Sequence, residues 1–455
     1  MAGLSTILEI ARQSLSAQRL GMDVTGHNIA NSGSVGYTRQ RLDLTASDPL
    51  HTSDGFLGTG VQAEHIGRIR EQFIDAQVRT ASDALGNAST KQTILSQVEA
   101  ALNEPSDSGL SSALNSFFNA FNDLSIHPED TAYRTVVLQK SALLTQSFHQ
   151  LSANIHQLQG DLLDNANAKV SEINELTRDI SVLDNQIVSA SGNGDDPGDL
   201  KDQRDVKLDR LAQLAKVGVS EDKAGSMIVS IGGTMVASRA GSVELSAAVV
   251  NGQIAVTAAG ATAPITALSG ELGGVVETYN KTLPGYLNAL DRLAGALAQQ
   301  VNTVHASGYG LGNPPSTGVD FFTGTTASDL SVNPAVTSDP SLIAASDDGR
   351  AGSNGTARSI AALSDAPVFD GGTTSIPKFF ANLVSTIGSD INAASTTQQT
   401  QELVVNQLKT QRDSVSGVSV DEEMNNLIQY QRAFDASARI VTAVDQMMQT
   451  IIQMV

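Results

Sequence analysis

Histidine side chains are the first candidates for chemistry in this sequence, because they bind metal ions. The chain has seven histidines, and His149 and His156 lie seven residues apart on one predicted helix. Ligands that share a metal ion from one helix usually sit three or four residues apart, so this pair is too widely spaced. Cysteine is absent, which excludes disulfide bonds, thiol catalysis and cysteine-bound metals. We therefore predict no metal site.

A cluster of aspartates is the second candidate, because carboxylates are the ligands that Ca²⁺ prefers. Asp195, Asp196, Asp199 and Asp202 follow one another closely. Their spacing is not that of an EF-hand loop, and the bidentate glutamate that ends such a loop is missing. We interpret the cluster as a solvated turn followed by a helix cap, with Asp199 capping a helix that begins at Leu200.

Gly308, Gly310 and Gly312 form a short glycine-rich stretch, the kind of segment that binds phosphate groups. No predicted strand precedes it and no predicted helix begins after it, so the pattern favours a turn over a dinucleotide site. The sequence also lacks the phosphate-binding loop, the zinc-binding helix motif and the serine-nucleophile motif. We predict that the protein is not an enzyme and binds no cofactor. The alternative, an enzyme, would need its site in residues 307–375.

Composition and charge narrow the class of protein further. The chain has 455 residues, of which 40% are apolar but only 4% aromatic, and tryptophan is absent. A core of small aliphatic side chains suits helix-on-helix packing. The net charge of −20 excludes the basic footprint of a nucleic-acid-binding protein and disfavours binding to an anionic membrane surface. We expect neither partner.

The first residues are not typical of a secretory signal. Glu9 and Arg12 interrupt their apolar stretch, and no basic segment precedes it. The sequence also has no run of 18 apolar residues, so we predict no membrane-spanning segment. If the protein leaves the cell, we expect it to use a route without a cleaved signal peptide.

Both chain ends have apolar residues at a seven-residue spacing. This spacing is the condition for a coiled coil, because an ordinary amphipathic helix would drift away from a strict seven-residue period. The first end has Leu8, Leu15, Met22 and Ile29, interleaved with Leu4, Ala11, Gln18 and Thr25; the last end has Leu427, Phe434, Val441, Met448 and Val455, interleaved with Tyr430, Ser437, Val444 and Ile451.

The C-terminal helix needs a partner, because an isolated monomer would expose its apolar stripe to water. The N-terminal helix is the natural partner. The alternative is a self-contained helical bundle that uses both ends for internal packing only.

Between the ends, the pattern predicts a mainly α protein with a β insertion, elongated and built from several domains. Its path resembles a hairpin, with the terminal helices paired as a coiled coil. Helices are expected at about 68–102 (ended by Pro105), 109–124, 129–189 with a break near Gly160, 200–216, 271–306, 377–414 and after Gly417, where Ser419 or Asp421 serves as cap. The predicted domains are 1–66 with 417–455 (terminal coiled coil and extended segment), 67–216 with 271–306 and 376–416 (helical body), 217–270 (β-rich outer insertion) and 307–375 (irregular, unassigned).

Two motifs connect the chain ends to a known superfamily. The first comprises Gly26 to Asn31 (GHNIAN) and Ser34 to Gln40 (SVGYTRQ), in which Gly36 suits a chain reversal and Tyr37 and Arg39 are available to dock on neighbours. It resembles the N-terminal signature of flagellar rod, hook and hook-associated proteins, with Ser34 where that signature usually has threonine. The second, Gly417 to Arg439, resembles the C-terminal helix of the same superfamily.

A third motif distinguishes within this superfamily. Residues 196–205 (DPGDLKDQRD), followed by Leu208, Asp209 and Leu211, resemble an internal segment of the hook-associated protein 1 family. Hook, rod and flagellin sequences are not expected to have it. A hook or distal-rod protein is therefore the first alternative; flagellin or the second junction protein, and a coiled-coil secreted effector or adhesin, are more distant ones.

The resemblance implies a structural role at the junction between the flagellar hook and filament. It implies a ring of copies with the hook protein below and the second junction protein and filament above. It also implies extracellular placement through the flagellar type III route, an export chaperone on the C-terminal helix, and terminal segments that fold on assembly. The expected assembly residues are Leu8, Leu15, Met22, Ile29, Asn31, Gly36, Tyr37, Arg39, Leu427, Tyr430, Phe434, Val441, Val444, Met448, Ile451 and Val455.

Overall fold

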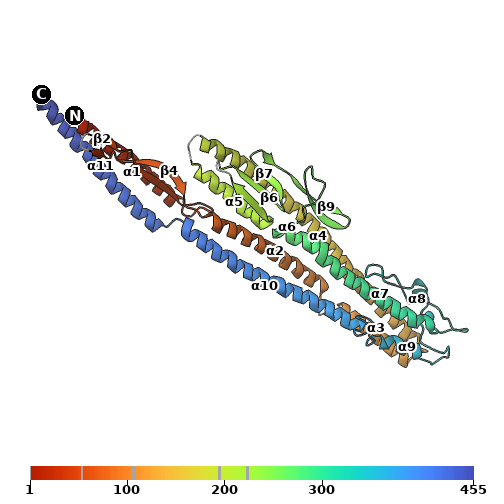
Figure 1. Ribbon diagram of the computed structural model, residues 1–455. Helices are drawn as coiled ribbons and strands as arrows, with labels where there is room; N and C mark the ends of the chain where they lie inside the picture. The colour runs from red at the N-terminus through yellow and green to blue at the C-terminus, as the bar shows by residue number, and fades with distance from the viewer. Residues whose placement is uncertain are drawn as a thin grey trace.

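The protein is a long, narrow molecule whose chain runs out and returns (Figure 1). The computed structural model describes residues 2–52, 55–104, 106, 109–192, 196–221 and 225–454, so Val455, Pro105 and Asp195 lie outside the described residues. Both termini lie at one end, where α1 (Ala2–Ala30) runs beside α11 (Val420–Met454). The body follows below them, and α3 (Leu110–Ile126) and α9 (Gly355–Ala362) lie at the far end.

Helices make up most of the body. They are α2 (Gln72–Leu102), α4 (Thr131–Gly192), α5 (Gly198–Leu214), α6 (Gly270–Glu277), α7 (Leu283–Ser307) and α10 (Ile376–Ser416), with a π-helical turn at Thr278–Thr282 that joins α6 to α7. The short elements are α8 (Pro334–Ser338) and a 3₁₀ turn at Pro340–Leu342.

Helix α4 passes through Gly160 without the predicted break. A glycine inside a helix costs about 1 kcal/mol relative to alanine. Ile155, Leu158 and Leu162 are buried on either side of it, and this burial outweighs the local penalty. Helix α2 begins at Gln72 rather than near residue 68, because Val61–Arg68 forms a strand.

The strands form small antiparallel sheets beside the helices. Strand β1 (Gln40–Ala46) pairs with β4 (Val61–Arg68) and lies against α1; β2 (Leu50–Thr52) pairs with β3 (Gly55–Leu57). The inserted region has a four-stranded sheet, β5 (Val217–Glu221), β6 (Met227–Ile231), β7 (Thr234–Ser238) and β8 (Gly241–Ser242), and the hairpin β9 (Leu245–Val250) with β10 (Gln253–Ala258). Strands β11 (Phe322–Thr323) and β12 (Ser331–Val332) form the last pair.

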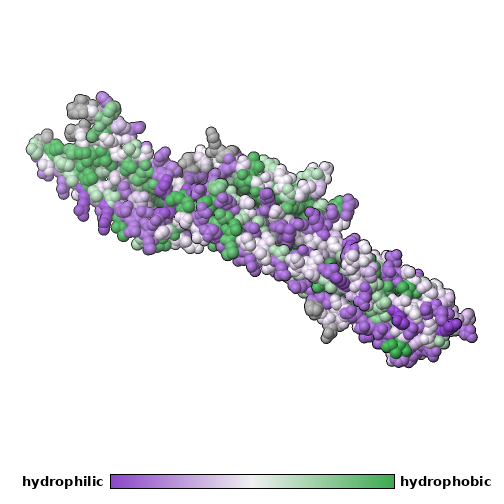
Figure 2. All heavy atoms as spheres, turned by 60° about the horizontal axis from the view of Figure 1, so that its bottom comes forward, coloured by the Kyte–Doolittle hydropathy of each residue, from purple (hydrophilic) through white to green (hydrophobic). Residues whose placement is uncertain are grey.

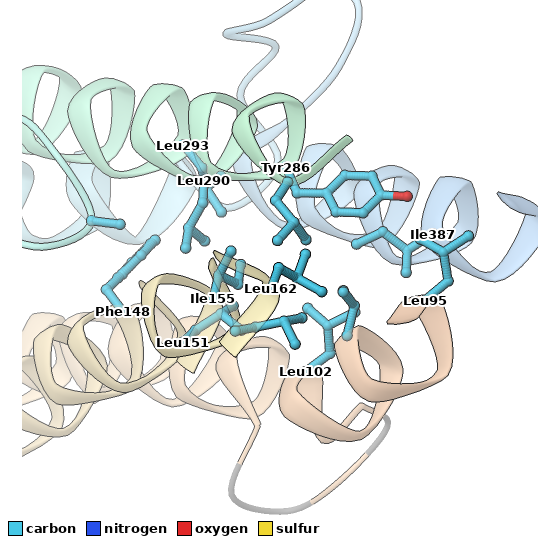
Figure 3. Close-up of a cluster of buried hydrophobic side chains, with 14 of the residues drawn as sticks. Leu95, Leu102, Phe148, Leu151, Ile155, Leu162, Tyr286, Leu290, Leu293 and Ile387 are labelled. Carbon is cyan, nitrogen blue, oxygen red and sulfur yellow. The ribbon is translucent and has the colours of Figure 1, made fainter. Parts of the chain in front are cut away.

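Aliphatic side chains from α2, α4, α7 and α10 form the centre of the core (Figure 3). The unassigned residues 307–375 complete it at the far end. Phe321 and Phe322 are fully buried there, and their rings contact those of Phe117 and Phe121. This region is therefore an ordered covering of the helical body, although it has little regular secondary structure.

Helix asparagines fix several strands to the body by a repeated arrangement. Each of these side-chain amides accepts from the N–H and donates to the C=O of a single strand residue, so it satisfies both backbone groups as a neighbouring strand would. The pairs are Asn28 with Gln40, Asn174 with Leu245, Asn280 with Ile254 and Asn302 with Phe322.

Candidate assembly interface

Helices α1 and α11 pack side by side in antiparallel register. Ser14 and Ser437 hydroxyls lie 2.9 Å apart, and Asn28 donates to Glu423 over 3.0 Å. Between these contacts, Gly21 faces the ring of Tyr430. Each step of seven residues along α1 matches a step of seven back along α11, which is the geometry of a two-stranded coiled coil.

Gly21 allows this close approach. A Cβ atom built at Gly21 would lie 2.7 Å from the Tyr430 ring, closer than atoms can pack. The tyrosine ring therefore fills a space that only a glycine leaves free on α1.

We expect Gly21→Leu to force α11 away from α1, because the added side chain overlaps the Tyr430 ring. In this variant, α11 should pack only weakly on α1. Amide hydrogen exchange should therefore be faster in residues 420–454 and unchanged in α4. Adding Tyr430→Ala to Gly21→Leu should restore slow exchange by emptying the overlapped space. No effect of Gly21→Leu on exchange would contradict the packing.

The structure brings together some of the sequence-predicted residues and places others on the flanks. We define the contact column of α11 as Glu423, Tyr430 and Ser437, which face Asn28, Gly21 and Ser14 of α1, together with Val444. Val444 is the next residue at the same spacing and is 1% exposed. The residues predicted from the apolar heptads lie half-buried beside these residues: Leu8, Leu15, Met22 and Ile29 on α1, and Leu427, Phe434, Val441 and Met448 on α11. Ile451 is 40% exposed, and Val455 is not among the described residues.

The described residues of the chain cover a third apolar column on α11 only in part. Ile440, Met447 and Met454 again lie seven residues apart, and they are 45%, 46% and 82% exposed. We call this set the exposed column. Figure 2 shows apolar surface gathered at the end of the molecule where the terminal helices lie. One α1 helix therefore covers only part of the apolar surface of α11.

The segment after α1 links this helix pair to the body. Gly36 has a φ of 79°, and a Cβ atom there would lie 2.1 Å from a methyl carbon of Val206, so the reversal needs glycine. The Tyr37 hydroxyl donates to Asn28 over 2.8 Å and lies 3.0 Å from Nδ1 of His27. Burial, with help from nearby carboxylates, raises the pKa of Tyr37, so the phenol stays protonated and able to donate.

Arg39 joins this segment to the start of α11. Its guanidinium pairs with Glu422 at 2.7 Å and with Glu423 at 2.8 Å, and its backbone N–H donates to the Ser416 carbonyl. Ser419 precedes α11, and its hydroxyl accepts from the Glu422 N–H over 3.4 Å. Asn31, also predicted as an assembly residue, ends α1 by bonding the His27 carbonyl.

Carboxylates of α5 anchor the same junction of segments to the body. Asp202 and Asp205 are almost fully buried, so the interpretation of the aspartate cluster as a solvated turn is wrong for Asp202. The charged network joins three carboxylates of α5 to four arginines. The carboxylates are Asp202, Asp205 and Asp209; the arginines are Arg68 of β4, Arg70 between β4 and α2, Arg79 of α2 and Arg412 of α10. We call this set the arginine–aspartate joint.

Asp205 is the centre of the joint. It pairs with Arg70, with Arg68 at 2.9 Å and with Arg79 at 3.0 Å. Burial alone would raise the pKa of Asp205, but the three guanidinium groups outweigh it and hold that pKa below its ordinary value.

The predicted cap of α5 is also wrong. The helix begins at Gly198, and Asp199 lies in its first turn, where its carboxylate accepts from the Gln40 side chain over 2.9 Å. Asp199 therefore helps to hold the linking segment instead of capping the helix.

The other side of α5 is fixed by Arg204, which is 1% exposed. It pairs with the equally buried Asp184 of α4 at 2.8 Å and with Glu221 of β5 at 2.9 Å. The motif at residues 196–205 thus connects the terminal helices, the helical body and the β-rich region.

Among the described residues, no three His, Asp or Glu side chains come together as metal ligands. No helix in the described part of the chain is long and apolar enough to cross a membrane. The stretch of Gly308, Gly310 and Gly312 is a loop after α7, in which the N–H of Gly310 donates to the Ser316 carbonyl. The main features of the described chain are therefore the pairing of α1 with α11 and the arginine–aspartate joint that fixes this pair to the body.

Comparisons with known proteins agree with this geometry. Residues 409–454, the end of α10 and all of α11, match the model of "Flagellar basal body rod FlgEFG protein C-terminal". Residues 95–322 match that of "Flagellar hook-associated protein FlgK helical domain". The flagellar hook-associated protein 1 of Bacillus subtilis (strain 168) is 31% identical, over 98% of this chain and 97% of its own length. That of Escherichia coli (strain K12) is 24% identical, over 96% and 97%.

A solved structure shares the fold. The flagellar hook junction protein FlgK from Burkholderia pseudomallei superimposes with a TM-score of 0.64 at 16% identity, covering 75% of this chain and all of that one. The two chain ends pair as a coiled coil beside a helical body, and the comparisons match flagellar proteins. This protein is therefore a structural protein of the bacterial flagellum. Within that class, the chain belongs to the flagellar hook-associated protein 1 (FlgK) family.

Proposed function

We propose that this protein forms the junction between the flagellar hook and filament, and that it assembles through its terminal helices. The observation that supports this proposal most is the exposed column of α11, whose apolar side chains stay 45% to 82% exposed among the described residues after α1 has packed against the same helix. Burying apolar surface between copies releases water and drives association. The protein then acts by assembly rather than by catalysis.

The proposed partners follow from this position. Copies of the chain form a ring, with the hook protein below and the second junction protein and filament above. The paired terminal helices form the inner layer, the helical body the next one, and the β-rich insertion points outward. A hook or distal-rod protein of the same superfamily is the alternative; the match of residues 95–322 to the FlgK helical domain favours the junction.

Before assembly, the exposed column needs protection from water. An export chaperone that covers α11 would mask Ile440, Met447 and Met454 inside the cell. The protein would then leave through the flagellar type III route without a cleaved signal peptide and reach the extracellular flagellum.

Removal of residues 421–455 tests the proposal. Electron microscopy should show hooks without filaments, and filament subunits should accumulate in the medium. The amount of truncated protein in the medium separates failed export from failed assembly. Normal filaments on hooks that contain the truncated protein would show that the terminal helix serves internal packing alone.

A further inference from the structure

Self-assembly of this chain has to overcome its charge. Each copy has a net charge of −20, so neighbouring copies repel one another wherever acidic surfaces meet. Close packing of copies along the helical body is therefore easiest where both facing surfaces have few charged residues. Two long surfaces among the described residues of the body have few.

The first surface is a groove between α2 and α4, with a volume of about 880 Å³. Its floor is aliphatic and includes Ile94, Leu158 and Leu162. Its walls are mostly hydroxyl and amide side chains: Ser82, Ser89, Thr90, Thr93 and Gln97 on α2, and Asn154, Gln157 and Asn165 on α4. Its lining has three charged residues, Asp161 and the ion-paired Lys169 and Glu271.

The second surface is the outward side of α10, which we call the α10 ridge. It contains Asn392, Thr396, Gln399, Leu403, Gln407 and Thr410, all exposed and at the three- and four-residue spacing of one helix face. Leu403 is 71% exposed in the middle of this ridge. From Asn392 to Thr410, Glu402 and Lys409 are the charged residues.

The groove and the ridge match in length and lie on different sides of one molecule. At 1.5 Å per residue, the ridge from Asn392 to Thr410 spans roughly 27 Å, and the groove from Ser82 to Ala101 roughly 29 Å. Helix α10 packs on α2 through its opposite side, where Val405 is buried, and contributes none of the described residues that line the groove.

We propose that the α10 ridge of one copy packs lengthwise into the α2–α4 groove of the next copy, with Leu403 over the aliphatic floor. The proposal rests on the self-assembly argued above and adds a second contact, in the body. Because the two surfaces differ, the contact is head-to-tail between neighbours and repeats around a ring. Hydroxyl and amide groups on both sides exchange hydrogen bonds without bringing acidic side chains together.

The absence of cysteine from the sequence gives a direct test. A Leu403→Cys and Thr93→Cys double variant places one thiol on the ridge and one on the groove wall. Hooks purified from cells that produce this variant should, after mild oxidation, give a ladder of disulfide-linked dimers, trimers and larger species on a non-reducing gel. Each single variant should remain monomeric on the gel, as should Thr93→Cys combined with Ser359→Cys, which lies on the exposed side of α9.

The outcomes separate this contact from the proposed junction role. The double variant present at hook tips with normal filaments, but with only monomeric or internally linked chains after oxidation, would overturn the groove contact and leave the junction role intact. Val444→Asp in the same background should remove the protein from hook tips. The ladder should then be lost as well, because it depends on assembly. A ladder from dilute purified monomer would mean random collision, and would also count against the contact.

Discussion

Val444→Asp is expected to leave hooks without filaments. Val444 is 1% exposed in the contact column of α11, in the register that places it opposite Ile7 of α1. Burial of a valine side chain stabilises a structure by about 1.5 kcal/mol or more. An aspartate there loses that stabilisation and must also take a charge out of water. The terminal helices should separate, and motility and hook-tip electron microscopy should both report the loss.

A matched substitution on the same helix separates position from charge. Gln446→Asp adds the same carboxylate two residues away, on the exposed side of α11, and should leave filaments and motility normal. Limited proteolysis should cut the Val444→Asp protein in residues 420–454 while α4 stays protected. If both variants assembled equally well, or both failed, pairing at Val444 would not be the cause.

Sequence periodicity predicted the terminal helices because apolar residues repeat every seven positions at both ends. On α11 it placed Tyr430, Ser437 and Val444 in one column, and these residues face α1. On α1 it did not predict the residues that make the closest contacts. Ser14, Gly21 and Asn28 are small or polar, so no hydrophobic pattern marks them. Their role depends on the size of the opposite side chain, as with Gly21 and Tyr430, and only the paired register reveals it.

The arginine–aspartate joint was missed for a different reason. Asp202, Asp205 and Asp209 have the three- and four-residue spacing of one helix face, which was a usable signal. Their partners come from far away in the chain: Arg68 is 137 residues from Asp205, and Arg412 is 203 residues from Asp209. Sequence spacing cannot show that these segments meet.

Residues 307–375 had no periodicity to interpret, because their order comes from tertiary contacts. Phe321 and Phe322 enter the core between α3 and α7, and Asn302 holds the backbone of Phe322. The pair of adjacent phenylalanines was the one available signal, in a chain with few aromatic residues.

Asp205→Asn is expected to destabilise the protein by about 3 kcal/mol, because it removes one partner from a buried ion network and leaves guanidinium groups undercompensated. Arg70 and Arg79 retain Asp75 and Asp209 as partners, which keeps the loss at this level. At an unfolding entropy of about 2.1 cal/mol/K per residue, the melting temperature should fall by roughly 3 °C. Circular dichroism on heating measures it, and Asp199→Asn on the same helix, with a 59% exposed side chain, is the matched control.

The pH dependence of this difference tests its cause. The joint holds the folded-state pKa of Asp205 below its ordinary value of 3.8. The stabilisation from the charged carboxylate is therefore complete above the unfolded-state pKa and is lost as the pH falls through the folded-state pKa. The gap in melting temperature between the wild type and Asp205→Asn should stay constant from pH 7 to pH 5 and narrow below pH 3.8. A gap that persists unchanged at pH 3 would mean that asparagine disturbs packing at this position instead of removing a charge that the arginines need.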